Sequence, residues 1–423
     1  MKKISFASMM LAVLLGSCSN ESIPGVGQEA ESNDLVPVSL GLNMGQADVS
    51  VTRGTGTVGG TTDADNVWNY ENLYVLMTTS DKDALEDQTA EWGFTSVKGQ
   101  ILKEQFDNSF FARPKSVDRD GSTVWTLDYQ CDPNEGGNLK YYPTKGVSDF
   151  FAYHVDDAAT SVDANGNPEI KIANNAITVD FAMNGSQDLL VGKADASVTA
   201  GKNGDEKTLG FSAKTARANI IPNLKMKHLL SRLTFTLKNG NSKTNGVKID
   251  SISVKSMYKG KMYVAYKEAP ADTITWEVED SAELFLMEKQ TVGDPGYFEN
   301  SLANGKCALK KLDQIEMNGV DEVEVGDALF ISPGGTKYEL KLYVRYAIDG
   351  GVEEKKTIKV NFLHPDRNSK FEAGKSYHLN VTVYGLENIV VDTQIEKWIE
   401  EDEDIDVDSD GFQTHPDGKE ELH

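Results

Sequence analysis

Apolar residues recur at every second position in many short segments of this chain, and this spacing restricts its fold more than any other feature. Successive side chains of a β-strand point to opposite faces, so a period of two buries one face and leaves the other in water. Glycine, asparagine and aspartate separate the segments. The pattern therefore predicts an all-β fold of antiparallel sandwiches. It is clearest in five sets: Val36, Val38, Leu40 and Leu42; Leu233, Phe235 and Leu237; Leu340, Leu342, Val344 and Tyr346; Ile358, Val360 and Phe362; Leu379, Val381 and Val383.

A turn signal lies between two of these sets. Asp349, Gly350 and Gly351 are residue types that adopt the backbone of tight hairpin turns at little cost. We therefore expect residues 338–362 to form one hairpin.

The first eighteen residues match an export signal. Lys2 and Lys3 supply positive charge, residues 4–15 are mostly apolar and uncharged, and small residues lead up to Cys18. The apolar run is shorter than the about 20 residues that a membrane-spanning helix needs, so we expect it to be cleaved. Small residues before a cysteine and polar chain after it are typical of a bacterial lipobox. Cys18 is therefore the predicted lipidation site, and an ordinary signal peptide with an incidental cysteine is the alternative.

Composition limits the expected partners. The chain has 66 Asp and Glu against 42 Lys and Arg, and its formal net charge is -24 at pH 7. A protein that neutralises phosphates needs clustered positive charge, so we expect no nucleic acid partner. The two other cysteines, Cys131 and Cys307, lie far apart in the sequence. We expect two buried thiols there, and a disulfide is the alternative.

Changes of composition divide the chain into five segments. The signal peptide covers residues 1–18, and a tether with a removable first strand covers residues 19–53. A polar, glycine-containing stretch then separates an N-terminal from a C-terminal β-sandwich domain, which span residues 54–222 and 223–408. Residues 409–423 form a tail that we expect to be disordered.

Motifs for catalysis or cofactor binding match only in part. Residues 54–59 fit a dinucleotide-binding glycine pattern, but no helix-forming run follows them to hold a pyrophosphate. Residues 406–411 with Asp417 resemble a calcium loop, although their non-helical flanks favour a solvated acidic tail. Adjacent acids such as Asp156 and Asp157 point to opposite faces of a strand and share no site. We therefore predict no enzyme and no cofactor.

The histidines give no metal-binding pattern either. His154, His228, His364 and His378 are not at metal-ligand spacing. We expect strand or turn positions for them and no metal site.

One basic residue lies in the glycine- and threonine-rich loop of the N-terminal half. Arg53 follows the alternating residues 36–42 and precedes Gly54. Exposed loop tips of small residues are the preferred sites of proteolytic cleavage. A cut between Arg53 and Gly54 would remove the lipid, the tether and the first strand together, and would leave an edge that another chain's strand can pair with. The alternative is that Arg53 is an ordinary surface arginine.

With these features the chain resembles the fimbrillin family, the FimA-type and Mfa-type pilin-like lipoproteins of anaerobic Gram-negative bacteria. The resemblance runs over most of the chain and depends on the order of its segments. They are the lipobox at Cys18, the loop at Thr52 and Arg53, and residues 150–153, 188–191, 227–235, 374–379 and 389–398.

The resemblance implies two transthyretin-like β-sandwich domains with few short helices. It implies export as a lipoprotein precursor at the cell outer membrane and cleavage at Arg53 by an Arg-specific surface protease. The mature chain would then assemble with other copies of itself and with other fimbrial subunits, by strand exchange, into a surface fimbrium that supports adhesion. Residues 386–407 are where this pattern places the donor strand. The length of chain after Trp398 departs from stalk subunits and leaves stalk, anchor and tip positions open.

A surface glycan-binding lipoprotein, or an adhesin at a fimbrial tip, is the alternative function. Exposed aromatic side chains on a sandwich would stack on sugar rings in such a protein. An aromatic residue in a strand is more often part of the core, and the five tryptophans are scattered along the sequence. They are Trp68, Trp92, Trp125, Trp276 and Trp398.

Overall fold

The computed structural model divides the chain into two compact units, residues 1–35 and residues 36–423. All residues that the structure describes belong to the second unit. They are residues 36–44, 73–79, 96–97, 100–101, 110–119, 122–128, 141–142, 147–155, 158–163, 167–173, 176–194, 197–200, 206–240, 246–266, 269–288, 311–317, 322–348, 352–384 and 389–396.

Strands make up nearly all the regular structure of these residues, which confirms the predicted all-β class. The helix among them is the five-residue α1 (Ala213–Arg217). Ser212 caps it: the Ser212 hydroxyl accepts a hydrogen bond from the Thr215 backbone at 3.3 Å, and the Thr215 hydroxyl accepts one from the Ser212 backbone at 2.8 Å. Within the described chain, no helix has the length and apolar character needed to cross a membrane.

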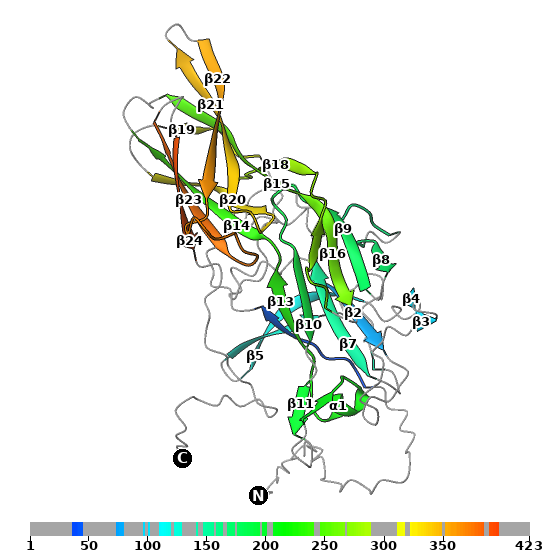
Figure 1. Ribbon diagram of the computed structural model, residues 1–423. Coiled ribbons are helices and arrows are strands. Elements are labelled where there is room, and N and C mark those ends of the chain that lie inside the picture. The colour runs from blue at the N-terminus through cyan, green and yellow to red at the C-terminus, as the bar shows by residue number, and fades with distance from the viewer. Residues whose placement is uncertain are drawn as a thin grey trace, which may run out of the picture. The chain divides into compact units, whose positions relative to one another are not determined.

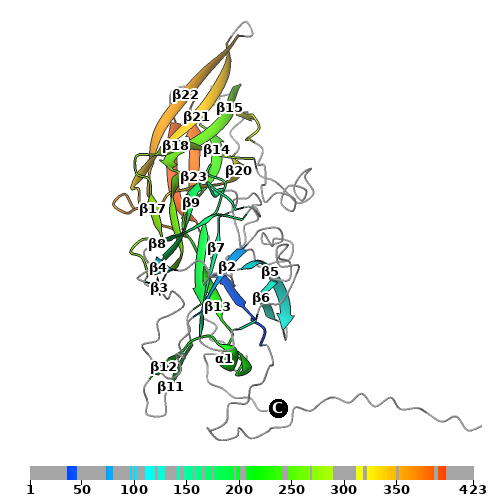
Figure 2. The same cartoon turned by 90° about the vertical axis from the view of Figure 1, so that its right-hand side faces the viewer.

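Seven strands close into a barrel (Figures 1 and 2). Its pairs are antiparallel, except that β1 and β13 run parallel. Side chains that point inward form a separate core, the barrel core, made of Val38, Leu40, Leu73, Val75, Met77, Tyr142, Phe150, Ala152, Leu190, Ala194, Phe211, Leu224 and Met226. The strand order is β1 (Gly41–Met44), β13 (Asn223–His228), β10 (Leu190–Ala194), β7 (Ser148–His154), β2 (Leu73–Thr79), β5 (Phe110–Arg119) and β6 (Ser122–Asp128).

A four-stranded antiparallel sheet packs on the outer face of the barrel. Phe151 of β7 meets Tyr266 of this sheet edge to face, with ring centroids 5.4 Å apart. Trp276 packs in the same way on Phe181, also at 5.4 Å, so this partly buried tryptophan lies against the core. The sheet order is β17 (Ile274–Trp276), β16 (Lys259–Tyr266), β9 (Ala176–Ala182) and β8 (Ile170–Ala173).

Two further sheets face each other as a sandwich. One has the order β20 (Glu322–Ile331), β14 (Ser231–Asn239), β23 (Ser376–Val383) and β24 (Ile389–Glu396), with β14 and β23 parallel. The other has the order β18 (Ser281–Phe285), β15 (Val247–Met257), β21 (Lys337–Ile348) and β22 (Val352–Leu363), and β19 (Ile315–Met317) also pairs with β15. Two short ribbons complete the described strands: β3 (Ser96–Val97) with β4 (Gln100–Ile101), and β11 (Ser197–Ala200) with β12 (Glu206–Leu209).

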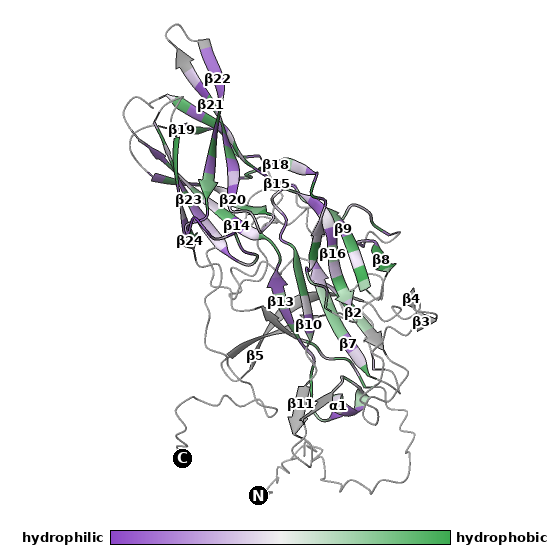
Figure 3. Ribbon diagram, viewed as in Figure 1, coloured by the Kyte–Doolittle hydropathy of each residue, from purple (hydrophilic) through white to green (hydrophobic). Residues whose placement is uncertain are grey.

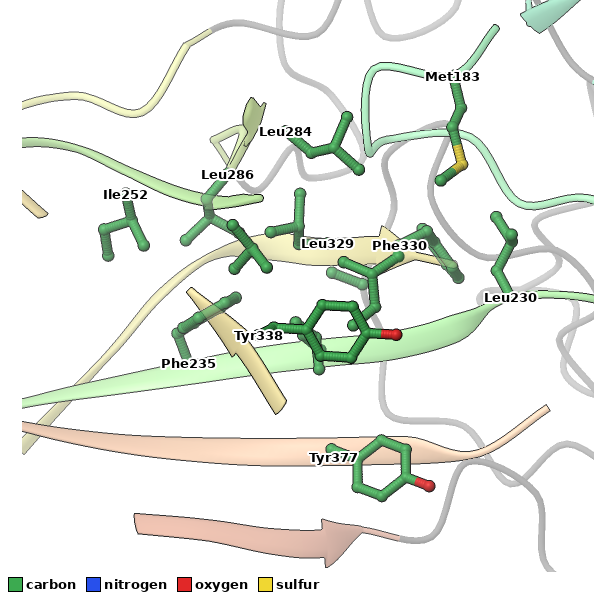
Figure 4. Close-up of a cluster of buried hydrophobic side chains, with 14 of the residues drawn as sticks. Met183, Leu230, Phe235, Ile252, Leu284, Leu286, Leu329, Phe330, Tyr338 and Tyr377 are labelled. Atoms are coloured by element: carbon green, nitrogen blue, oxygen red, sulfur yellow. The ribbon is translucent and has the colours of Figure 1, made fainter. Parts of the chain in front are cut away.

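The predicted hairpin and the predicted alternation are confirmed in this sandwich. β21 and β22 pair continuously from Lys337 opposite Leu363 to Ile348 opposite Val352. The alternating apolar residues of β14, β21, β22 and β23 fill a second core, the main core, which also takes buried residues from β7, β9, β15, β16 and β20. Figure 4 shows part of it, with side chains from several of these strands meeting at Leu329 and Phe330.

A tight loop joins the part of the chain before residue 190 to the C-terminal sandwich. Gly185 has a φ of 100° and accepts a hydrogen bond from the Phe330 backbone at 2.7 Å. A Cβ at this position would lie 2.6 Å from Leu329, so only glycine allows the approach. The domain boundary between residues 222 and 223 stays a prediction; β13 and β16, which follow it, pair with β10 and β9, which precede it.

Candidate functional site

The predicted site residues Cys18, Arg53 and Gly54 all lie outside the described residues. The same holds for Cys131 and Cys307. Lipidation at Cys18, processing between Arg53 and Gly54, and the state of the two other cysteines therefore stay predictions. The structure does describe the first strand, which the predicted cut would remove.

β1 holds the barrel closed (Figure 2). It lies between β13 and β6, with four register positions on β13 and one on β6, where Gly41 is opposite Thr126. Gly41 also donates a hydrogen bond to the Pro222 carbonyl at 2.9 Å, and the Val36 carbonyl accepts one from Tyr142 at 2.9 Å. The segment is therefore bound by backbone hydrogen bonds on both sides. We call its place between β13 and β6 the β1 slot.

The side chains of this segment complete the barrel core. Val38 is 0% exposed and Leu40 is 3% exposed, whereas Ser39 between them faces solvent. Burial of two aliphatic side chains of this size contributes about 1.5 to 3 kcal/mol each. The period-two pattern predicted for residues 36–42 is therefore confirmed where side chains are described, and these residues serve as one wall of a core.

β13 forms one side of the β1 slot. On its other edge, β13 pairs antiparallel with β10, from Leu190 opposite His228 to Ala194 opposite Leu224. Along β13, Leu224 and Met226 point into the barrel core, and Lys225 and Lys227 are exposed. β13 therefore remains anchored on one side, whatever strand occupies the slot on the other.

The part of the predicted donor segment that the structure describes is β24. It pairs antiparallel with β23 at eight positions, from Ser376 opposite Glu396 to Val383 opposite Ile389, and it ends the sheet order. Ile389 packs in the main core, whereas Val390 and Ile395 are 51% and 61% exposed. β24 is thus an edge strand with apolar side chains on its open surface, which is an arrangement suited to pairing with another chain.

Three of the four histidines singled out from the sequence lie in strands, as predicted, and the fourth, His364, directly follows a strand. His228 ends β13, where its Nδ1 is 2.7 Å from Asp188 Oδ2, and His378 of β23 has its Nδ1 2.8 Å from the Thr234 hydroxyl. His154 lies in β7, and His364 follows β22. Among the described residues, no group of three or more His, Cys, Asp or Glu side chains is placed to bind a metal ion.

Two buried charged residues elsewhere in the described chain had no signal in the sequence. Asp149 of β7 is 4% exposed and lies on the opposite face of the strand from Phe150 of the barrel core. Arg232 of β14 is 2% exposed and donates a hydrogen bond to the Ser376 hydroxyl at 3.0 Å. Charged residues are seldom buried, so the alternation of apolar neighbours predicted neither position.

Residues 61–398 match the model of a protein family described as fimbrillin-like. The chain belongs to the fimbrillin-like family. Membership supports a fimbrial or adhesin role at the cell surface.

Solved structures similar to this fimbrillin-like chain include two that the match covers almost completely. A candidate cell adhesion protein from Bacteroides uniformis is 14% identical with a TM-score of 0.40, and the match covers 87% of this chain and 99% of that one. The fimbrial anchor protein Mfa2 from Porphyromonas gingivalis is 9% identical with a TM-score of 0.32, over 85% of this chain and 98% of that one. No curated protein matches the chain.

The fimbrillin-like match leaves out both ends that concern the candidate site. Residues 36–44, which include β1, precede it, and the chain beyond Trp398 follows it. The roles of these two segments therefore have to be argued from this chain's own residues.

Proposed function

We propose that this chain is a structural subunit of a surface fimbrium that assembles by strand exchange and supports adhesion. It is exported as a precursor acylated at Cys18, which anchors it to the outer membrane. An Arg-specific surface protease then cuts between Arg53 and Gly54. The observation that carries the proposal is that β1, which closes the barrel, precedes Arg53 in the chain, so this single cut releases the anchor and opens the barrel together.

Removal of β1 leaves a gap in the barrel core and two unpaired strand edges, and a strand from another chain can fill both. The barrel core loses Val38 and Leu40, and β13 and β6 both become edges with unpaired backbone groups. Backbone pairing and alternating apolar side chains from a neighbouring chain supply the same interactions. The trimmed subunit therefore gains stability by assembly with other copies or with other fimbrial subunits.

The donor strand comes from residues 386–407 of the neighbour. β24 lies in this range and is already extended, so the region adopts a strand conformation without help from a partner chain. Its position at the end of a sheet leaves one edge for pairing.

The experiment uses the purified precursor with a recognition sequence for a specific protease placed between Arg53 and Gly54. Cleavage should convert monomers into ladders that resist SDS, because inserted strands are released only when the barrel unfolds. The same chain without the recognition sequence and with Arg53→Ala serves as the control and should remain monomeric. Trimmed protein that stays monomeric at high concentration would contradict the proposal.

A further inference from the structure

The β21–β22 hairpin differs in charge from the chain as a whole. Its two strands carry six Lys and Arg residues against three Asp and Glu residues, whereas the whole chain carries 42 against 66. Figure 3 colours parts of β22 as strongly hydrophilic. A local excess of positive charge on an acidic protein attracts anions to that part of its surface.

Four of these positive residues lie on the face of the hairpin that points away from the main core. The apolar residues of both strands that fill the main core are at even positions, so side chains at odd positions point outward. The register places Lys355 of β22 opposite Arg345 of β21. It places Lys359 of β22 opposite Lys341 of β21. We call the surface formed by these four residues the basic face.

Carboxylates already hold the two positive residues of β21. Arg345 Nε is 2.7 Å from each carboxylate oxygen of Asp250, and Arg345 Nη1 is 3.3 Å from Glu353 Oε2. Lys341 donates a hydrogen bond to Glu283. These ion pairs fix the positions of Lys341 and Arg345, and they engage the acidic groups of the neighbouring strands.

The two lysines of β22 have no such partner. Lys355 and Lys359 are exposed, and neither makes a salt bridge or a side-chain hydrogen bond within the described chain. Glu339, on the same face of the hairpin, lies 3.6 Å from Lys341 instead. Lys355 and Lys359 are four positions apart in a strand, so their backbones are separated by about 14 Å. The basic face therefore offers two uncompensated positive charges at a wide spacing.

An aromatic pair lies between these two charges. Tyr343 is opposite Thr357, which is midway between Lys355 and Lys359. The Tyr343 ring packs near Phe285, with the ring centroids 6.0 Å apart, and both residues are partly exposed. Aromatic side chains of this kind offer apolar faces on which sugar rings stack.

The spacing of the charges favours a polysaccharide over a nucleic acid. Double-stranded DNA carries one negative charge for each stretch of about 1.7 Å along its axis. Two free lysines about 14 Å apart match few of those charges, and the net charge of -24 repels the remainder. An acidic polysaccharide carries its charges more sparsely and presents sugar rings between them.

We propose that the basic face binds an acidic polysaccharide, with Lys355 and Lys359 on its anionic groups and a sugar ring against Tyr343. This inference rests on the adhesive role in the proposed function and names the class of ligand for it. Binding requires neither cleavage nor assembly, because the hairpin is complete in the uncut chain.

Surface plasmon resonance of the uncut precursor over immobilised polysaccharides tests this inference. The precursor should bind chondroitin sulfate, which carries sulfates and carboxylates, and it should not bind neutral dextran. The affinity should fall as salt concentration rises. Hyaluronan, which carries carboxylates alone, identifies the anionic group: equal binding to hyaluronan means that a carboxylate is sufficient, and binding to chondroitin sulfate alone means that a sulfate is required.

Charge-reversed variants locate the binding surface. Lys355→Glu with Lys359→Glu should lower the affinity for chondroitin sulfate by roughly tenfold or more, because each reversal replaces an attraction with a repulsion. Lys355→Arg with Lys359→Arg should retain the affinity, because it keeps both charges. A matched control carries Lys227→Glu and Lys370→Glu, which are exposed positions outside the hairpin. It changes the net charge equally and should bind as the wild type does.

Circular dichroism verifies that every variant is folded. Wild-type affinity in the Lys355→Glu, Lys359→Glu variant would overturn the inference, and so would an equal loss in the matched control. A wild-type precursor that binds neither acidic polysaccharide, or that binds only single-stranded DNA, would overturn it as well. None of these results bears on ladder formation after cleavage, which tests the proposed assembly separately.

Discussion

Burial changes the acid–base chemistry of Asp149. It is buried on the face of β7 opposite the barrel core, and its Oδ1 has no hydrogen-bond partner among the described residues. Burial raises the pKa of Asp149 from 3.8 to about 7, and the positive charge of Lys193 opposes that rise. The folded protein therefore holds a proton at Asp149 in a pH range where the unfolded chain has lost it.

This proton makes stability depend on pH. Because the pKa of Asp149 is higher in the folded state, the free energy of unfolding should fall as pH rises from about 4 to about 7. Asp149→Asn removes this dependence, so the variant should match the wild type near pH 4 and exceed its stability at pH 8 by on the order of 4 kcal/mol. Urea unfolding at several pH values measures the difference. Asp392→Asn, at an exposed position of β24, is the control, and a stability difference that does not change with pH would contradict the assignment.

Leu40 offers a second test at a single position, because its side chain completes the barrel core only before trimming. Leu40→Ala should lower the free energy of unfolding of the precursor by about 2 to 4 kcal/mol. After cleavage the variant and the wild type are the same molecule, so their assembly rates should be equal. Ser39→Ala, at the exposed neighbour, should have little effect. Thermal unfolding of the intact precursor measures the first effect, and the rate of ladder formation after cleavage measures the second. A trimmed variant less stable than the trimmed wild type would contradict the removal of residues up to Arg53.

Individual strands were predictable, whereas their partners were not. The alternation in Leu233, Phe235 and Leu237 places one face of β14 in the core, because side-chain period and burial are local properties of a strand. The parallel pairing of β1 with β13 joins residues about 180 positions apart, from Gly41 to Asn223, and no local signal encodes such a partner. The closed barrel therefore follows from tertiary packing, and the candidate slot was predictable only as a strand that precedes Arg53.

β1 should bind in the slot even when it is supplied as a separate peptide. A synthetic peptide of residues 36–44, added in excess to freshly trimmed protein, should slow ladder formation because it refills the slot with the original strand. A peptide with Val38→Asp and Leu40→Asp should not, since it would place two carboxylates in the barrel core. Equal inhibition by both peptides would show that neither binds in the slot.

At the scale of the whole molecule, the described residues pack into two cores. The barrel core includes Val38 and Leu40, and the main core continues from the outer face of β7 through the C-terminal sandwich. Loss of β1 therefore removes side chains from one core only. The second core keeps its packing, so the trimmed subunit should stay folded while its barrel is incomplete.

Hydrogen exchange can map this division. After trimming, amides of β13 and β6 should exchange faster by at least tenfold, because each strand has lost a neighbour and the core beneath them is open. Amides of β14 and β15 should keep their protection, since they lie in the main core. Assembly should restore protection in β13. A uniform loss of protection over all four strands would mean that the two cores unfold as one unit.

The strand pairing around Arg232 also determines how a subunit transmits tension along a fibre. Glu396 ends β24 opposite Ser376, which lies opposite Arg232, and Arg232 follows β13 by only three intervening residues. In a fibre joined as proposed, tension enters a subunit at β13 and leaves it after Glu396, so its path is short and bypasses the β21–β22 hairpin. Single-molecule pulling should extract β24 while that hairpin stays intact. The hairpin would thus be carried unstrained along the fibre, available to touch whatever surface the bacterium meets.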